Sequence, residues 1–155
     1  MAPAMGHMEA WAPDDERIAQ LLPACRRADA EIQSLEPLYA AHGDAHARNL
    51  LPTAAGWRWL DFEDASLMPR LWDIASFITN TALFHGFAHP VCRYALAAST
   101  AAADKAALAF ALKARAIMAV TTNLSLARRG HGDLAFAEAQ LARVPGFLAR
   151  MDEGL

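Results

Sequence analysis

The sequence predicts an α+β domain that is mostly helical, with one small β-hairpin near its middle. Apolar residues recur at helical spacing before and after the hairpin, and much of the apolar content is alanine, which favours helix. The hairpin is predicted by two short apolar runs, residues 49–52 and 57–60, joined by Thr-Ala-Ala-Gly. No internal repeat or linker divides the chain, so residues 13–155 are expected to form one lobe.

Composition excludes several classes of protein. The 155 residues are enough for one domain with a core, and a net charge of −3 with mixed signs does not indicate nucleic-acid binding. Cys25 and Cys92 are far apart and form no Cys-x-x-Cys pair, so neither a disulfide framework nor a zinc site is expected. No signal peptide is evident, and polar residues interrupt the apolar runs, which argues against a membrane-spanning helix. A cytoplasmic setting fits these features.

The predicted elements before the hairpin are helical up to a short strand. Residues 1–12 are expected to be poorly ordered. A helix is predicted to begin at Pro13 and to end at Pro37, with Pro23 kinking or splitting it. Residues 38–41 read as a short strand that leads into the loop at His42.

Four helices are predicted after the hairpin. Residues 71–84 are apolar on all sides, which indicates a buried helix, and a second helix runs from Pro90 to about residue 98. Asp104 is expected to cap a long helix over 105–129 that Gly130 ends, and a last helix covers about 133–151.

Polar side chains gather at the open end of the predicted hairpin. Asp44 and Asn49 precede its first strand, and Asp61, Glu63 and Asp64 follow its second. Because a hairpin brings its two ends together, Asp44, Asn49 and Asp61 are expected to lie near one another. Mg²⁺ prefers a few hard oxygen ligands and takes the rest from water and phosphate, so these residue types suit metal-assisted phosphoryl transfer.

The spacing of these residues resembles the catalytic motifs of protein kinases, in which Asp is followed by four residues and Asn, and later by a metal-binding Asp. The closer resemblance is to the aminoglycoside phosphotransferase and choline kinase group, with H-G-D-x-H-x-x-N and then D-F-E. The matching positions are His42, Gly43, Asp44, His46, Asn49, Asp61, Phe62 and Glu63. The sequence departs from that pattern at Ala45, Ala47 and Arg48, where Leu, Pro and Gly are common, and at Leu67-Met68, where Gly-Asp is usual.

The resemblance implies the C-terminal lobe of a protein-kinase-like fold that uses ATP and Mg²⁺ to phosphorylate a small-molecule hydroxyl. It implies that Asp44 is the catalytic base and that Asn49 and Asp61 bind the metal. His42 and His46 would support the loop, and Glu63 is either a solvated or a hairpin-bracing carboxylate. Asp73 is either a first-turn helix carboxylate or a brace for the catalytic loop, and both roles are compatible.

The resemblance covers the C-terminal lobe only. Family members carry a smaller N-terminal lobe with a phosphate-covering loop and a strand Lys, whereas the 41 residues before His42 contain no Lys and no Gly-rich loop. The chain is either a piece of a longer product or a free-standing lobe. We therefore expect weak or absent MgATP binding, no useful activity alone, and either self-association or pairing with a missing lobe.

Two alternatives compete with this interpretation. The chain could be a non-catalytic relic or pairing module with the same fold. Less favoured is a metal-dependent hydrolase that uses His42, Asp44 and His46, which would project from one face of a strand. A second His-Gly-Asp at 131–133 lacks the following Asn and D-F-E, so it reads as a helix stop with Asp133 as the cap. Trp57 and Trp59 share a strand face and are expected in the core.

Overall fold

The computed structural model describes residues 2–100 and 105–154. The protein is α+β and mostly helical, as the sequence predicts. The chain forms two compact units, residues 1–34 with 113–155 and residues 35–112. The single lobe over residues 13–155 that the sequence predicts stays a prediction.

The described part of the first unit consists of helices and the turns that join them. It contains α1 (Ala2–Trp11), α2 (Glu16–Ser34), most of α5 (Lys105–Arg128) and α6 (Leu134–Asp152). The expectation of a poorly ordered segment at residues 1–12 is corrected, because α1 occupies residues 2–11. Met8 is fully buried, and His7 Nδ1 lies 2.7 Å from Ser125 Oγ. These long-range contacts hold α1 in place, and composition alone does not reveal them.

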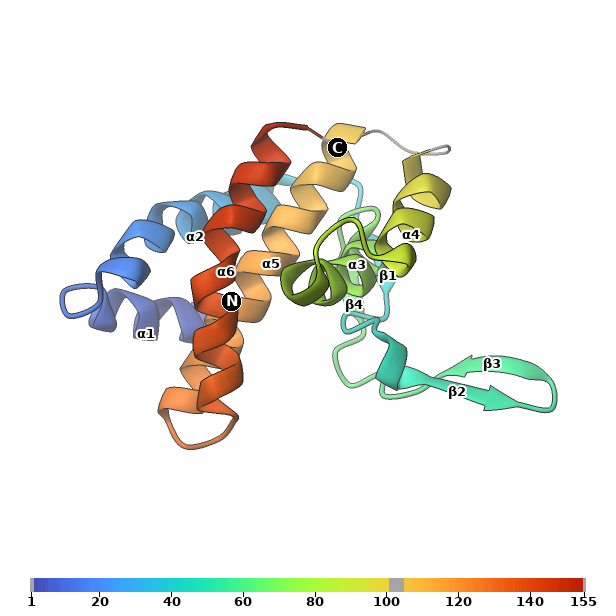
Figure 1. The fold of residues 1–155 in the computed structure, drawn as a ribbon, viewed down its shortest axis with the longest axis horizontal. Helices are drawn as coiled ribbons and strands as arrows, with labels where there is room; N and C mark the ends of the chain where they lie inside the picture. Colours follow the sequence, from blue (N-terminus) through green and yellow to red (C-terminus); the bar gives the residue numbers. More distant parts are fainter. Residues whose placement is uncertain (1, 101–104, 155) are drawn as a thin grey trace. The chain divides into compact units, whose positions relative to one another are not determined.

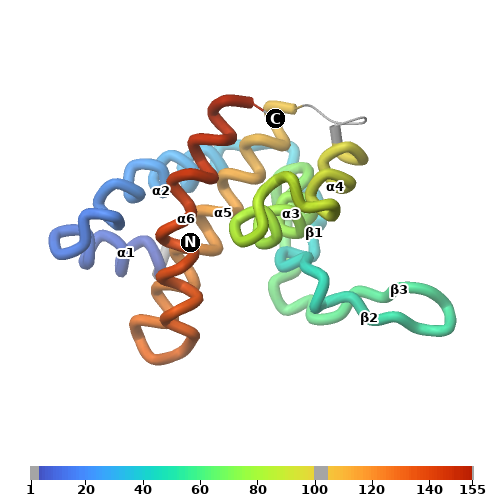
Figure 2. Tube along the Cα trace, viewed as in Figure 1, coloured from blue at the N-terminus to red at the C-terminus, as the bar shows by residue number. Residues whose placement is uncertain are grey.

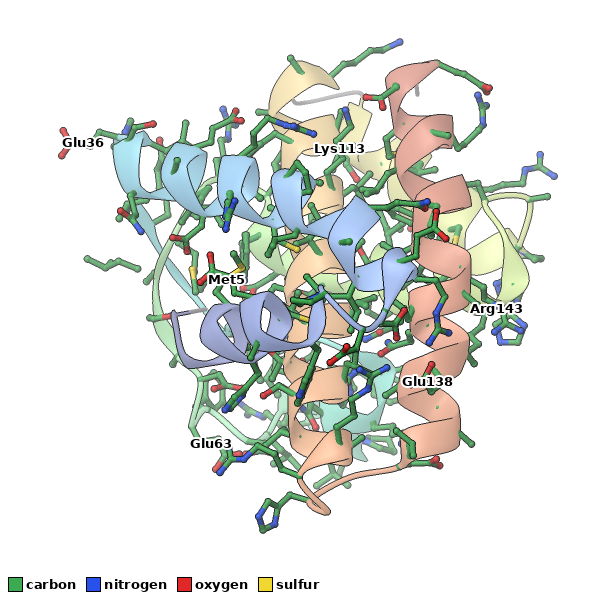
Figure 3. All side chains as sticks on the ribbon, turned by 90° about the vertical axis from the view of Figure 1, so that its left-hand side faces the viewer. Met5, Glu36, Glu63, Lys113, Glu138 and Arg143 are labelled. Carbon is green, nitrogen blue, oxygen red and sulfur yellow. The ribbon has the colours of Figure 1, made fainter. Side chains whose placement is uncertain are left out.

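Helices α5 and α6 run antiparallel, side by side (Figures 2 and 3). Lys113 pairs with Asp152 near one end of the two helices. Asn123 Nδ2 donates to Gln140 Oε1 at 2.8 Å near the middle, and Arg128 lies 3.0 Å from Glu138 toward the other end. Between them, apolar side chains are removed from water and supply the main stabilisation of this unit; they include Val120, Leu124, Leu141 and Val144.

The turn between α5 and α6 has the predicted chemistry. Gly130 has φ +82°, which suits glycine at a helix C-terminus. The Asp133 carboxylate accepts a hydrogen bond from the Phe136 N–H at 3.0 Å and caps α6. The second His-Gly-Asp is therefore a helix stop and restart, as predicted. Pro145 lies inside α6 and Pro23 lies inside α2, so neither proline splits its helix. The predicted helix cap Asp104 lies outside the described residues.

In its described residues, the second unit has four short strands in two sheets. Strands β2 (Leu50–Thr53) and β3 (Gly56–Trp59) form the predicted antiparallel hairpin, with Leu50 opposite Trp59. Strand β1 (Tyr39–Ala41) pairs antiparallel with β4 (Ser66–Met68). The sequence did not predict β4, because three residues after a loop carry too little periodicity to be recognised. A short 3₁₀ helix, η1 (Ala47–Asn49), leads into β2.

Helical segments complete this unit, among them the start of α5. Helices α3 (Trp72–His85) and α4 (Pro90–Thr100) pack side by side, and the β2–β3 hairpin projects away from them (Figure 1). Helix α3 buries Trp72 and Ile78, as its apolar sequence predicts. The hairpin is different, because Trp57 is 69% exposed and Trp59 is 40% exposed. The expectation that both tryptophans are core residues is wrong, since none of the described elements covers the hairpin's two faces fully.

One described helix, α5, is long and apolar enough to cross a membrane by length and composition. This is weak evidence for a membrane span, because 56% of the most apolar window is buried inside the protein. The core helix of a water-soluble protein has the same properties.

Candidate functional site

The open end of the hairpin gathers the candidate residues. The Leu60 N–H donates to the Asn49 carbonyl at 2.9 Å, which extends the β2–β3 ladder by one pair. Asn49 and Asp61 therefore lie at the same end of the hairpin. The side-chain amide of buried Asn49 donates from Nδ2 to the Asp44 carbonyl at 3.1 Å. The fold thus brings together Asp44, Asn49 and Asp61, as the hairpin argument predicts.

Asp73 holds the backbone of the loop that carries Asp44. Its Oδ2 accepts the His42 N–H at 2.9 Å, and its Oδ1 accepts the Gly43 N–H at 3.1 Å. Asp73 sits in the first turn of α3, so both roles considered from the sequence coexist at this residue. Because two N–H groups bind one carboxylate, the path of the chain just before Asp44 is fixed by a helix start.

His42 lies beneath the loop rather than toward solvent. It is buried, and its Nε2 lies 2.8 Å from the Leu60 carbonyl, which can only accept, so Nε2 carries the proton. Its ring packs against Trp59 and Phe62, with centroid distances of 5.1 and 4.5 Å. His42 therefore ties the loop before Asp44 to the strand end before Asp61.

Gly43 is required by a close backbone approach that sequence reasoning missed. It has φ +87°, and a Cβ built there would lie 2.1 Å from the Asp64 carbonyl oxygen. Such contact with backbone cannot be relieved by turning a side chain. The glycine in the motif was the available signal, since glycine allows a positive φ and a close approach of another backbone segment.

Asp44 is accessible from solvent and has a histidine neighbour. Its carboxylate Oδ2 lies 3.2 Å from His46 Nε2, and the two side chains are 37% and 27% exposed. A positioned imidazole at this distance can orient the carboxylate. The exposed edge of Asp44 leaves room for a substrate group to approach, which a proton acceptor requires.

The residues after the hairpin are more exposed. Asp61 adopts φ +62°, a left-handed conformation that is uncommon outside glycine and is often found at functional sites. Asp61, Glu63 and Asp64 are all exposed, and Glu63 lies in the loop after β3 (Figure 3). The Ser66 hydroxyl donates a hydrogen bond to the Asp64 carbonyl at 3.0 Å, and this contact helps to fix the conformation of the loop.

The hydrolase alternative finds no support in the described part of the chain. Across residues 2–100 and 105–154, no three His, Cys, Asp or Glu side chains gather in a metal-binding group. His42 instead directs Nε2 to the Leu60 carbonyl, so it does not share a face with Asp44 and His46 as the alternation argument required.

The comparison with known families agrees with the motif. The family model described as "Phosphotransferase enzyme family" (APH) matches residues 3–111, which is more than half of the chain. The chain belongs to the APH phosphotransferase family. No curated protein matches it. The APH match includes every candidate site residue between His42 and Asp73 and stops before the second His-Gly-Asp at 131–133. The resemblance drawn from the sequence is thereby confirmed.

Proposed function

We propose that this chain is the C-terminal catalytic lobe of an ATP- and Mg²⁺-dependent phosphotransferase that acts on a small-molecule hydroxyl. The observation that carries the proposal is the gathering of Asp44, Asn49 and Asp61 at one end of the hairpin. Membership of the APH family supports phosphotransferase chemistry at this site. Family membership does not by itself establish a kinase-like lobe, the use of ATP and Mg²⁺ or the role of each residue. These three points are our inference.

The donor set fits Mg²⁺. The nitrogen of the Asn49 amide is engaged with the Asp44 carbonyl, which leaves its oxygen as the atom for a cation. Asp61 offers an exposed carboxylate. Two hard oxygens match an ion that completes its coordination with water and phosphate. When bound, MgATP supplies the transferable phosphoryl group and positive charge near it.

In the proposed reaction, Asp44 acts as the general base. Its carboxylate accepts the proton of the attacking hydroxyl, and its position is fixed by the Asp73 contacts to His42 and Gly43. His46 orients the carboxylate from the side. In such phosphotransferases the protein contributes mainly positioning and charge stabilisation rather than covalent chemistry.

The test uses Mn²⁺, which takes Mg²⁺ sites and broadens nearby NMR signals. With ATP present, Mn²⁺ should broaden amide signals of residues 44–49 and 60–64 first, at low affinity. Asp61→Ala and Asn49→Ala should each remove this local broadening, because each takes away one metal oxygen.

The second His-Gly-Asp provides the matched control. Asp133→Asn keeps a good N-cap for α6 and alters the same tripeptide outside the proposed site. It should leave the broadening pattern unchanged. Identical broadening in wild type and Asp61→Ala would refute the metal-binding role and with it the proposed function.

A second candidate function, a non-catalytic pairing module, is favoured by the exposed apolar surface of the second unit. On more than one face of its strand pairs, this unit has apolar side chains that are 45–69% exposed, namely Tyr39, Leu51, Trp57, Leu60, Phe62 and Leu67. An isolated two-stranded hairpin is marginally stable in water, so cover by a second copy of the chain would stabilise it. Sedimentation should then show concentration-dependent dimers that Trp57→Ser weakens. Tyr94→Ser, an exposed aromatic on α4, is the control and should leave them intact.

A further inference from the structure

We infer that the acceptor of this enzyme is an uncharged, largely apolar alcohol carrying a ring system, held in a pocket between α3, α4 and the catalytic loop. The inference rests on the proposed function and adds the substrate class. The pocket has a volume of about 670 Å³ and lies wholly within the second unit. Its wall consists of Ala45, Trp59, Asp73, Ile74, Phe77, Pro90, Val91, Tyr94, Ala95, Ala98 and Ser99.

The pocket has the composition of a small-molecule site. Such sites typically enclose roughly 300–1,000 Å³ and combine apolar and aromatic walls with a few polar groups. Here three aromatic side chains, Trp59, Phe77 and Tyr94, face the same space as aliphatic ones. A ligand that fills this space must bury apolar surface, which is the main source of its affinity.

The charges around the pocket argue against a polycationic acceptor. Asp73 is the one carboxylate in the sequences of α3 and α4, and both of its oxygens already accept backbone N–H groups. An aminosugar with several ammonium groups would lose the hydration of all of them in a wall that offers one carboxylate, Asp73. An uncharged acceptor avoids this cost.

The pocket adjoins the proposed chemistry through two residues. Ala45, which is 1% exposed, directly follows Asp44 in the catalytic loop. Trp59 ends β3, two residues before Asp61. The side chain of Ala45 is a single methyl group, so it takes up little of the space at this wall. A ring bound here would hold its hydroxyl arm beside the loop that carries Asp44.

The first experiment measures binding of 2-(1-naphthyl)ethanol, an uncharged aromatic alcohol, to the full chain by fluorescence. Choline and kanamycin serve as charged competitors. Ala98→Phe places a ring into the pocket from an exposed wall position and should weaken naphthylethanol binding by roughly tenfold or more, because the space is overfilled. Val91→Phe, at another exposed wall position, should do the same.

Ala97→Phe is the matched control, because Ala97 is also exposed on α4 but lies outside this wall. It should change binding less than about twofold, since an exposed ring there fills no part of the pocket. Equal affinities in the wild type and both wall variants, or displacement of the probe by choline or kanamycin, would overturn the inference. Circular dichroism of each variant verifies that the helices remain folded.

The second experiment links the pocket to the metal site. Mn²⁺ added with ATP should relax the hydroxyl-arm protons of bound naphthylethanol more strongly than its distal ring protons, and Asp61→Ala should abolish the difference. If amide broadening at residues 44–49 occurs but the bound alcohol is not relaxed, the acceptor inference fails while the proposed function stands. If the broadening itself is absent, the proposed function fails, and binding of the alcohol reports a pocket with no acceptor role.

Discussion

The Asp73 carboxylate accepts the backbone N–H of His42 at 2.9 Å, a contact between residues that are 31 positions apart in the chain. The same carboxylate accepts the Gly43 N–H at 3.1 Å. The first turn of α3 therefore sets the backbone that presents Asp44. The position of the proposed base therefore depends on helix α3 as much as on the loop of residues 42–49.

Replacing Asp73 tests this dependence directly. Asp73→Ala leaves two backbone N–H groups without their acceptor and should lower the free energy of unfolding by about 1–3 kcal/mol. Hydrogen exchange of the His42 and Gly43 amides should accelerate more than that of α6 amides. Asp64→Ala, which removes an exposed carboxylate from the same unit, is the control and should leave both amides protected. Unchanged exchange in Asp73→Ala would show that the brace is dispensable.

A pair of glycine variants separates backbone strain from steric clash. Gly43 and Gly56 both have positive φ, +87° and +104°, but only a Cβ at Gly43 would meet backbone, the Asp64 carbonyl. Gly56→Ala should therefore cost about 1 kcal/mol of unfolding free energy, the conformational penalty alone. Gly43→Ala adds overpacking of about 1–3 kcal/mol and should also disturb the amides near Asp44. Equal melting temperatures for the two variants would contradict the close approach.

The sequence predicted the hairpin, the buried helix α3 and the cap at Asp133, because local spacing and turn residues determine these features. It also predicted that Asp44, Asn49 and Asp61 lie together, since a hairpin closes its own ends. It did not predict α1 or the exposure of Trp57, because both depend on which distant surfaces pack against them. The sequence also did not predict the close approach of Gly43 to the Asp64 carbonyl, because the two residues lie in different loops and no local pattern indicates that these loops meet.

The first unit should lose stability in acid through Asp15. This carboxylate bonds Arg17 at 2.8 Å and Arg128 at 2.7 Å, and Glu138 joins both arginines. The hydrogen bond from Arg17, helped by that from Arg128, holds the pKa of Asp15 well below its ordinary value near 3.8. A carboxyl whose pKa is lowered on folding stabilises above its unfolded pKa and loses that contribution as pH falls through the folded pKa.

Asp15→Asn should therefore be less stable than the wild type by about 1 kcal/mol at pH 7, a modest value for a network near the surface. The difference should shrink as the pH falls below about 4, where the unfolded carboxyl takes up its proton. Urea unfolding at pH 7, 4 and 3 measures it. Asp14→Asn, an exposed neighbour, is the control and should match the wild type at pH 7. A difference that grows in acid would contradict the assigned sign.

The two cysteines should be inert in the folded protein. Burial raises the pKa of the Cys25 thiol to about 11 and also raises the pKa of Cys92. Because the thiolate is the reactive form, neither residue should react measurably with a disulfide reagent at pH 8. Both should react at once in denaturant. Fast reaction of one thiol in the native state would show that its unit opens readily.

The last prediction concerns the activity of the 155-residue chain itself. Its lysines are Lys105 and Lys113, and Gly6 is the one glycine before Gly43, so the sequence before the catalytic loop offers neither a phosphate-binding Lys nor a Gly-rich loop. Holding donor and acceptor in line can account for roughly 7–11 kcal/mol of barrier reduction. With the phosphates held from the Asn49 and Asp61 side alone, much of that positioning is lost.

We therefore expect weak MgATP binding by calorimetry and no phosphorylation of alcohols above the Asp44→Asn background. Asp133→Asn should be indistinguishable from the wild type in both assays. Turnover that Asp44→Asn abolishes and Asp133→Asn retains would show that the chain is catalytically self-sufficient.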